Sequence, residues 1–264
     1  RTKHMKTIHP FLLTDFYKID HKSQYPENTT VVYSNFTPRK SRIKDIKEVV
    51  FFGLQYFIKE YLIDGFKEFF AMPEEEAIAE YKRMIDNTLG KDTVDIENIR
   101  EVHRLGYLPL KIKALPEGTR CPIGVPMMTI VNTHPKFSWL TNFIESVMST
   151  IIWMPITSAT IAAEYRRILD NYAKITVGNT DFVQWQAHDF SFRGMAGVEA
   201  CMLSGAAHLL SFTGTDTIPA IYFLEKYYQA NVEKEIVGSS VVATEHAIMM
   251  AGEKENEREK KITN

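Results

Sequence analysis

Three short polar segments in the second half of the chain hold the residue types best suited to chemistry. They cover residues 188–194, 212–217 and 238–246, and each is rich in His, Asp, Ser or Thr. Each follows a stretch that we expect to be a strand, and in parallel α/β folds the loops at the carboxyl ends of strands form the active site. We therefore take these three segments as the candidate functional site.

The side chains of these segments suit a phosphorylated substrate that carries an aromatic ring. Arg193 can hold phosphate oxygens through two parallel hydrogen bonds, and Phe190 can stack on a ring. Asp216 can accept hydrogen bonds from an amide, and His246 can exchange protons or accept a transferred group. Each also has a structural interpretation: an ion pair for Arg193, a helix cap for Asp216 and a helix start for His246.

Sequence motifs of several common enzyme classes are absent. The chain has no GxxxxGK[ST], GxGxxG, HExxH or GxSxG pattern, which argues against a P-loop phosphate site and a Rossmann dinucleotide site. No cluster of metal-ligating residues is expected either, so we predict no metal site built from side chains.

Composition and charge narrow the class of protein further. The 264 residues include 31 Lys and Arg against 33 Asp and Glu, a net charge of −2, so no basic excess indicates nucleic acid or an anionic membrane. The chain has only two cysteines, too few for a disulfide framework, which favours a reducing compartment. The longest apolar stretch, residues 143–156, is too short to span a bilayer. We expect a cytoplasmic globular protein.

Hydrophobic patterning predicts a mixed arrangement of strands and helices around the three segments. The expected strands cover residues 30–37, 108–115, 125–132 and 183–190, and the expected helices cover 52–70, 73–90, 139–153, 158–174, 196–210 and 219–228. After a domain boundary near Gly106 the strands alternate with helices. This alternation implies βα units and a largely parallel sheet or barrel.

The three segments, in this order, resemble the nicotinamide phosphoribosyltransferase family of the nicotinate and nicotinamide phosphoribosyltransferase superfamily. The resemblance extends from residue 11 to residue 250. Further matching motifs are Leu13-Thr14-Asp15-Phe16-Tyr17-Lys18, His21 with Gln24-Tyr25-Pro26, Val32-Tyr33-Ser34 to Arg39, Val50-Phe51-Phe52-Gly53-Leu54-Gln55, Pro116-Glu117-Gly118, Trp139-Leu140-Thr141-Asn142 with Glu145, and Pro155-Ile156-Thr157 with Ala159-Thr160. The spread of these motifs makes the resemblance specific.

This resemblance implies a fold and a domain organisation. The fold is that of type II phosphoribosyltransferases, an irregular α/β barrel, incomplete in this chain, that follows an N-terminal α+β domain. We expect residues 1–5 to be an expression scar, residues 6–105 to form the N-terminal domain, and residues 106–252 to form the first part of the barrel. Residues 253–264 are expected to be a charged tail.

The resemblance also implies a reaction and residue roles. Family members transfer phosphoribosyl from phosphoribosyl pyrophosphate to nicotinamide in NAD salvage, giving nicotinamide mononucleotide and pyrophosphate. By resemblance, Phe190 stacks on one face of nicotinamide, and Tyr17 of a second subunit covers the other face. Arg193 meets the phosphorylated side of the ligand, and Asp216 reads the carboxamide nitrogen. These roles imply a homodimer with its sites at the interface.

A second set of roles concerns phosphate and energy coupling. By resemblance, His246 is transiently phosphorylated by ATP, and Asp15, Arg39 and Ser240 lie near the site, with Arg39 reaching a phosphate across the dimer interface. Mg²⁺ is expected on the pyrophosphate oxygens of the substrate, where it keeps several waters.

Two alternatives stay open. One is the nicotinate enzyme of the same superfamily, although Asp216 would repel an anionic carboxylate. The other is a non-catalytic fragment that needs or regulates a longer partner, because family chains are about twice as long as this one.

Overall fold

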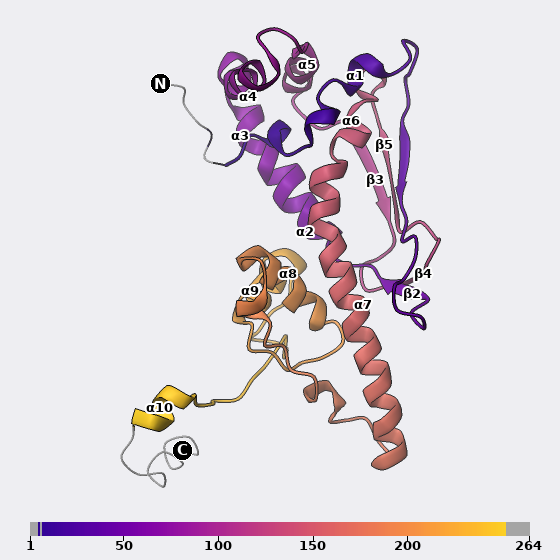
Figure 1. The fold of residues 1–264 in the computed structure, drawn as a ribbon, viewed down its shortest axis with the longest axis vertical. Helices are drawn as coiled ribbons and strands as arrows, with labels where there is room; N and C mark the ends of the chain where they lie inside the picture. Colours follow the sequence, from indigo (N-terminus) through magenta and orange to yellow (C-terminus); the bar gives the residue numbers. More distant parts are fainter. Residues whose placement is uncertain (1–4, 6, 252–264) are drawn as a thin grey trace.

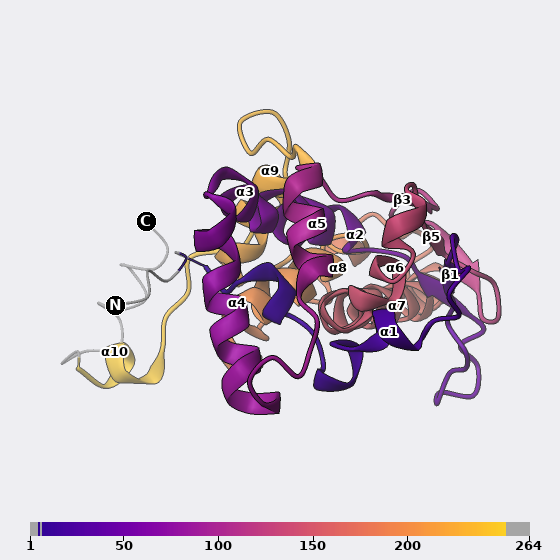
Figure 2. The same ribbon diagram turned by 90° about the horizontal axis from the view of Figure 1, so that it is seen from above.

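The computed structural model describes Met5 and residues 7–251, and Figure 1 shows their arrangement. The predicted scar, apart from Met5, and the predicted charged tail lie outside the described residues. Met5 itself is buried in the hydrophobic core. In both views, two helices, α6 (Leu140–Phe143) and α7 (Glu145–Thr176), lie between a group of three helices on one side and a small sheet on the other (Figures 1 and 2). The three helices are α3 (Gly65–Ala71), α4 (Glu74–Leu89) and α5 (Glu97–Leu105).

The main sheet has three antiparallel strands in the order β1-β5-β3. They are β1 (Tyr33–Phe36), β5 (Met128–Asn132) and β3 (Leu110–Ala114), with Ile112 opposite Ile130. A second antiparallel pair joins β2 (Glu48–Val50) to β4 (Arg120–Pro122). Strands were expected within 30–37, 108–115 and 125–132, and this is confirmed.

The expected parallel pairing is wrong for every named strand of the described residues, since β1, β3 and β5 pair antiparallel. Parallel neighbours need a crossover of a dozen or more residues, usually a helix. Only β4 and turns lie between β3 and β5, so the chain turns back on itself. Because β1 pairs with β5, the sheet joins residues from both sides of Gly106, and the predicted domain division stays a prediction.

Among the described residues, five α-helices precede β3. The short α1 (His21–Gln24) is followed by α2 (Leu54–Phe57) and α3 (Gly65–Ala71), which a π-helical stretch, Ile58–Asp64, joins into the helix expected over 52–70. α4 (Glu74–Leu89) starts directly after Pro73 with three acidic residues in its first turn, which the positive end of the helix dipole favours. α5 is Glu97–Leu105.

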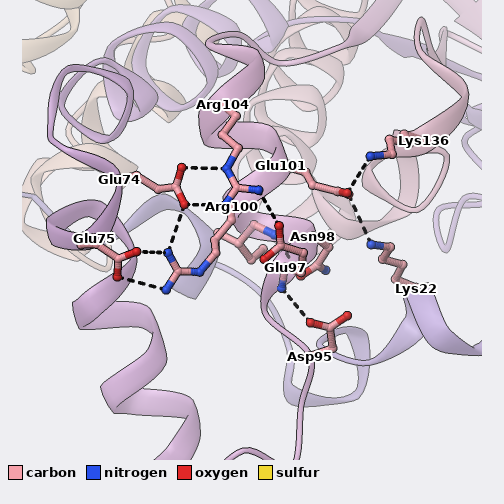
Figure 3. A network of polar contacts seen from close by, with 11 residues as sticks. Lys22, Glu74, Glu75, Asp95, Glu97, Asn98, Arg100, Glu101, Arg104 and Lys136 are labelled. Carbon is pink, nitrogen blue, oxygen red and sulfur yellow. Dashed lines mark hydrogen bonds and ion pairs between the residues drawn. The ribbon is translucent and has the colours of Figure 1, made fainter.

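Ion pairs connect α4 to α5 on the surface (Figure 3). Arg100 binds Glu74 and Glu75, with N–O distances of 3.1 and 2.5 Å. Arg104 binds Glu74 and also Glu97 within its own helix. The two guanidinium groups therefore lie across the acidic start of α4 and fix the two helices side by side.

A single helix, α7 (Glu145–Thr176), follows the short α6 (Leu140–Phe143). The prediction of two helices, 139–153 and 158–174, is wrong because Pro155 lies inside α7 without ending it. A proline removes one helix hydrogen bond, and burial of Pro155 and Ile156 against the core stabilises the helix through that position. Gly53 has φ +105°, and a Cβ there would lie 2.7 Å from the Pro155 ring, so only glycine fits beneath this turn.

By length and composition alone, α7 could cross a membrane; it is the one such helix among the described residues. Half of the most apolar 18-residue stretch of α7 is buried against the rest of the chain. Such burial is typical of the central helix of a globular domain. α7 packs on α8 (Val198–His208) and on β2.

The second half continues with α8, α9 (Ile218–Tyr228) and α10 (His246–Ala251). The expected helices at 196–210 and 219–228 are confirmed. The strand expected over 183–190 is wrong, because Val183–Trp185 forms a 3-10 turn and only Asp189 pairs with another strand segment. Val183 is fully buried, so packing of a tight turn accounts for the apolar start of that stretch.

Polar contacts attach α8 and α9 to the N-terminal helices. The hydroxyls of Tyr56 and Tyr61 both donate to Glu199 at the start of α8, each at 2.6 Å. Lys59 donates to the Tyr227 carbonyl at 2.6 Å, near the end of α9. These contacts fix the position of the helices that support the candidate site.

Candidate functional site

Parallel pairing brings the three predicted segments together. Asp189 pairs with Thr215, and Gly214 pairs with Ser239, each through an isolated parallel bridge. The Asp189 N–H donates to the Gly214 carbonyl at 3.2 Å, and the Asp216 N–H donates to the Asp189 carbonyl at 2.9 Å. The expected juxtaposition of these segments in parallel register is confirmed, and it is limited to single bridges.

A carboxylate with two donors on one oxygen forms the centre of this cluster. Asp216 Oδ1 lies 2.6 Å from His188 Nε2 and accepts a hydrogen bond from Ser240 Oγ at 2.8 Å. Asp216 Oδ2 has no hydrogen-bond partner within the described part of the chain. The contact with His188, followed by that with Ser240, holds the pKa of Asp216 below its usual value. Asp216 is therefore an ionised acceptor with one free oxygen.

An exposed aromatic ring lies next to this carboxylate. The Phe190 side chain is 69% exposed, and its ring centroid is 4.6 Å from that of His188. Arg193 is exposed on the 3-10 turn Phe192–Gly194 and has no partner in the region the structure describes. The cluster thus offers a flat apolar surface and an amide acceptor, and Arg193 is an exposed cation three residues after Phe190 in the chain.

Buried Asp189 supports this arrangement from below. It is 8% exposed, and its Oδ1 accepts the Ser191 N–H at 2.9 Å, which fixes the turn after Phe190. Burial acts to raise the pKa of Asp189, but hydrogen bonding from Ser191 outweighs it and the pKa lies below its usual value. Asp189 is ionised and structural.

Asp15, Tyr17 and Arg39 lie in a different place, around the start of α7. Asp15 and Tyr17 line a cavity of about 480 Å³ together with Glu145 and Ser146. The Asp15 carboxylate accepts a hydrogen bond from the Ser146 hydroxyl. Arg39 lines an adjoining cavity of about 460 Å³ that also includes Glu145. These three predicted residues therefore share one groove.

This groove and the three-segment cluster are separate within one chain. No residue that lines the groove belongs to the three segments, and Tyr17 is 63% exposed. His246 is the first residue of α10 and is exposed; Figure 1 shows α10 apart from α8 and α9. The structure brings Phe190, Asp216 and Ser240 together; it does not bring Tyr17 or His246 to them.

Sequence reasoning assigned no role to His188 or Asp189. In an extended segment alternate side chains point to the same face, so residues 188 and 190 should share a face while residue 189 points inward. The structure shows this arrangement, with the His188 and Phe190 rings together and Asp189 buried. The alternation was readable in the sequence.

The described residues contain no group of three His, Cys, Asp or Glu side chains arranged to hold a metal ion.

Comparison with known proteins gives matches at both ends of the chain. A family model described as "Nicotinamide phosphoribosyltransferase, N-terminal domain" matches residues 10–112. A second, described as "Nicotinate phosphoribosyltransferase (NAPRTase) family", matches residues 185–264. Among solved structures, human nicotinic acid phosphoribosyltransferase has a TM-score of 0.57 at 16% identity, over 90% of this chain and 40% of that one. This likeness shows the fold class, that of type II phosphoribosyltransferases.

Curated relatives match almost the whole chain. A nicotinamide phosphoribosyltransferase of Acinetobacter baylyi is 49% identical over 96% of the chain and 50% of its own length. One of Xanthomonas campestris is 30% identical over 93% of the chain and again 50% of its own length. The chain therefore spans about half the length of the curated relatives it matches. On these matches, the chain belongs to the nicotinamide phosphoribosyltransferase family, within the nicotinate and nicotinamide phosphoribosyltransferase superfamily.

Proposed function

We propose that this chain is part of a pentosyltransferase that transfers phosphoribosyl from phosphoribosyl pyrophosphate to nicotinamide, releasing nicotinamide mononucleotide and pyrophosphate in cytoplasmic NAD salvage. The observation that carries the proposal is the free Oδ2 of ionised Asp216 beside the exposed Phe190 ring. The names of its relatives support the same reaction.

The cluster has the complementary groups for nicotinamide. The pyridine ring stacks on the exposed Phe190 ring, and binding is favoured because the two apolar faces in contact are removed from water. The carboxamide N–H donates to Asp216 Oδ2, a charge-assisted hydrogen bond. In this orientation the ring nitrogen points away from Asp216, because amide and ring nitrogen lie on different edges of the base. The ring nitrogen is then free to attack C1 of the ribose.

Catalysis in this proposal depends on alignment and on charge. As pyrophosphate leaves C1, the ribose develops oxocarbenium character, and Arg193 holds phosphate oxygens so that attack and departure are in line. Mg²⁺ bound to the pyrophosphate group of the substrate would neutralise part of the leaving-group charge.

A homodimer completes the site in this proposal. Tyr17 is exposed at the groove beside α7, where a second subunit can receive it. It then covers the face of nicotinamide that Phe190 leaves open, and Arg39 from the same groove reaches a phosphate of the neighbouring site. Closure by the second ring also excludes water from the reacting carbon.

Energy coupling in this proposal passes through His246. Its side chain is exposed at the start of α10, where ATP can reach it. Transfer of the γ-phosphoryl group from ATP to His246 would release ADP, and hydrolysis of the phosphohistidine would drive the synthesis.

The experiment that tests the proposal compares nicotinamide with nicotinic acid in a preparation that contains the complete barrel. The unmutated protein should use nicotinamide far better, because the Asp216 carboxylate repels the carboxylate of nicotinic acid. Asp216→Asn should narrow the difference while raising KM for nicotinamide. Equal kcat/KM for the two bases in the unmutated protein would reject the assignment in favour of the nicotinate enzyme or another reaction.

The second candidate is a fragment that acts only with a longer partner. The coverage of about half of each curated relative favours it as the state of the isolated chain. An intact-mass measurement on purified protein, looking for a second polypeptide, together with an assay of the chain alone, separates the two cases.

A further inference from the structure

The His188 side chain contacts both parts of the proposed base site. Its Nε2 lies 2.6 Å from Asp216 Oδ1, and its ring centroid lies 4.6 Å from that of Phe190. Among the described residues, no other ring packs against Phe190. Asp216, the proposed acceptor for the amide, and Phe190, the proposed stacking partner of the base, thus both contact His188.

The contact with Asp216 decides which oxygen remains free. A carboxylate that is 44% exposed can rotate and present either oxygen to water. Here His188 Nε2 and Ser240 Oγ both donate hydrogen bonds to Asp216 Oδ1. Hydrogen bonds to an ionised acceptor are roughly twice as strong as those between neutral groups. The two donors therefore hold the carboxylate with Oδ2 outward.

The opposite edge of the imidazole is enclosed. A Cβ on Gly214 would lie 2.8 Å from His188 Nδ1, so residue 214 must be small for the ring to occupy this position. Gly214 also belongs to the parallel bridge with Ser239. Gly214 and Asp216 belong to the same segment, 212–217. The close approach of the Gly214 backbone limits the orientations open to the His188 ring, and the observed orientation is the one that places Nε2 at Asp216 Oδ1.

We propose that His188 is a positioning residue that sets base selectivity: it orients Asp216 toward the carboxamide and supports the Phe190 ring on which the base stacks. This inference rests on the proposed function. His188 acts through its neighbours and makes no contact with the reacting atoms.

Two substitutions separate the donor from the ring. His188→Gln keeps an N–H donor near the Nε2 position and removes the ring, whereas His188→Phe keeps the ring and removes the donor. In the complete-barrel preparation, His188→Phe should raise KM for nicotinamide about tenfold and lower the nicotinamide preference in kcat/KM by a similar factor, the size of one lost hydrogen bond to a charged group. His188→Gln should raise KM only about threefold and keep the preference. In both, kcat should change less than KM.

A double variant tests whether His188 acts through Asp216. In the Asp216→Asn background, His188→Phe should no longer change the preference between the two bases. If His188→Phe does not fold, Gly214→Ala replaces it: its methyl group would lie 2.8 Å from His188 Nδ1 and so displaces the imidazole from the position in which Nε2 meets Asp216 Oδ1, with the His188 side chain retained. His134→Gln, a histidine that caps a distant 3-10 turn, is the matched control and should leave the preference unchanged.

The outcomes of these experiments show separately whether the proposed function fails and whether the role of His188 fails. An unmutated protein that does not use nicotinamide contradicts the proposed function. Normal use of nicotinamide with equal losses in His188→Gln and His188→Phe, or an undiminished His188→Phe effect in Asp216→Asn, overturns the role of His188 alone.

Discussion

At the scale of single residues, two neighbouring aspartates of the cluster have opposite surroundings and different tasks. Asp189 is buried and uses Oδ1 on the Ser191 backbone. Asp216 is open to solvent, with Oδ1 occupied and Oδ2 free. Both have a pKa below the usual value, so both are ionised at neutral pH. Only the exposed one can offer its charge to a ligand.

His246 allows a prediction that separates chemistry from energy coupling. The residues proposed to position the substrates, Phe190, Arg193 and Asp216, do not include it, so base attack on C1 does not require it. His246→Ala in a complete barrel should abolish ATP hydrolysis and ATP stimulation and leave slow synthesis without ATP. Synthesis with and without ATP, ATPase activity and melting temperature measured on one preparation test this.

The matched variant for this test is Arg193→Ala. It should depress synthesis equally with and without ATP, because it weakens alignment of the phosphorylated substrate. A histidine that only starts a helix would instead lower the melting temperature with ATP dependence unchanged. Full ATP stimulation in His246→Ala would remove His246 from the mechanism.

At the scale of elements, one carboxylate joins three pieces of the fold. Glu117 accepts the N–H groups of Gly53 at 3.0 Å and of Gln55 at 2.6 Å, at the start of α2. It also accepts the hydroxyl of Tyr228 at 2.7 Å, at the end of α9. Burial, followed by the nearby Glu117 charge, raises the pKa of Tyr228. Glu117 thus attaches the end of α9 to the start of α2.

Glu117→Ala should therefore lower the stability of the whole chain. It leaves the N–H groups at the start of α2 and the partly buried Tyr228 hydroxyl without an acceptor, at about 1–3 kcal/mol for each unsatisfied group. We expect a loss of at least about 3 kcal/mol in the free energy of unfolding by denaturant titration, the lower end for three such groups. Glu27→Ala removes an exposed carboxylate and should change stability by less than about 0.5 kcal/mol; equal effects of the two variants would contradict the role of Glu117.

Helices and strands were predicted well where local patterns dominate. α4 lies between Pro73 and Gly90, as the start and stop residues indicate. The single α7 was not predicted, because the tolerance of Pro155 depends on burial against residues distant in sequence, such as Gly53. Pairing direction was missed for a similar reason: alternation places a residue on a face but does not say which neighbouring strand it meets.

The residues of the candidate site also differ in whether the sequence could predict their placement. Phe190, Asp216 and Ser240 were predicted to lie together, since segments after neighbouring strands meet at one edge, and the parallel bridges bring them together. The proposed role of His188 was not predicted because it depends on two contacts, one with Phe190 and one with Asp216 of another segment. A contact between segments has no signature in composition or spacing.

At the scale of the whole molecule, the two groups of candidate residues are separate: neither cavity of the groove is lined by a residue of the three-segment cluster. The groove with Tyr17 lies at the start of α7, and the cluster with Arg193 lies beyond α7 next to α8. A proposed site that needs both groups therefore requires two chains. Symmetric dimers place the same pair of contacts on both sides of the axis.

This requirement predicts complementation between two inactive variants in a preparation with the complete barrel. If each site takes Arg193 from one subunit and Tyr17 from the other, a mixed dimer of Tyr17→Ala and Arg193→Ala chains has one intact site and one site with both changes. Random exchange makes half of the dimers mixed, so activity should recover to about a quarter of the unmutated value. Phe190→Ala mixed with Arg193→Ala is the control: both residues belong to the same chain's cluster, and no site is restored. Absence of recovery in the first mixture, after subunit exchange has been verified by native mass spectrometry, would mean that Tyr17 does not complete a neighbouring subunit's site.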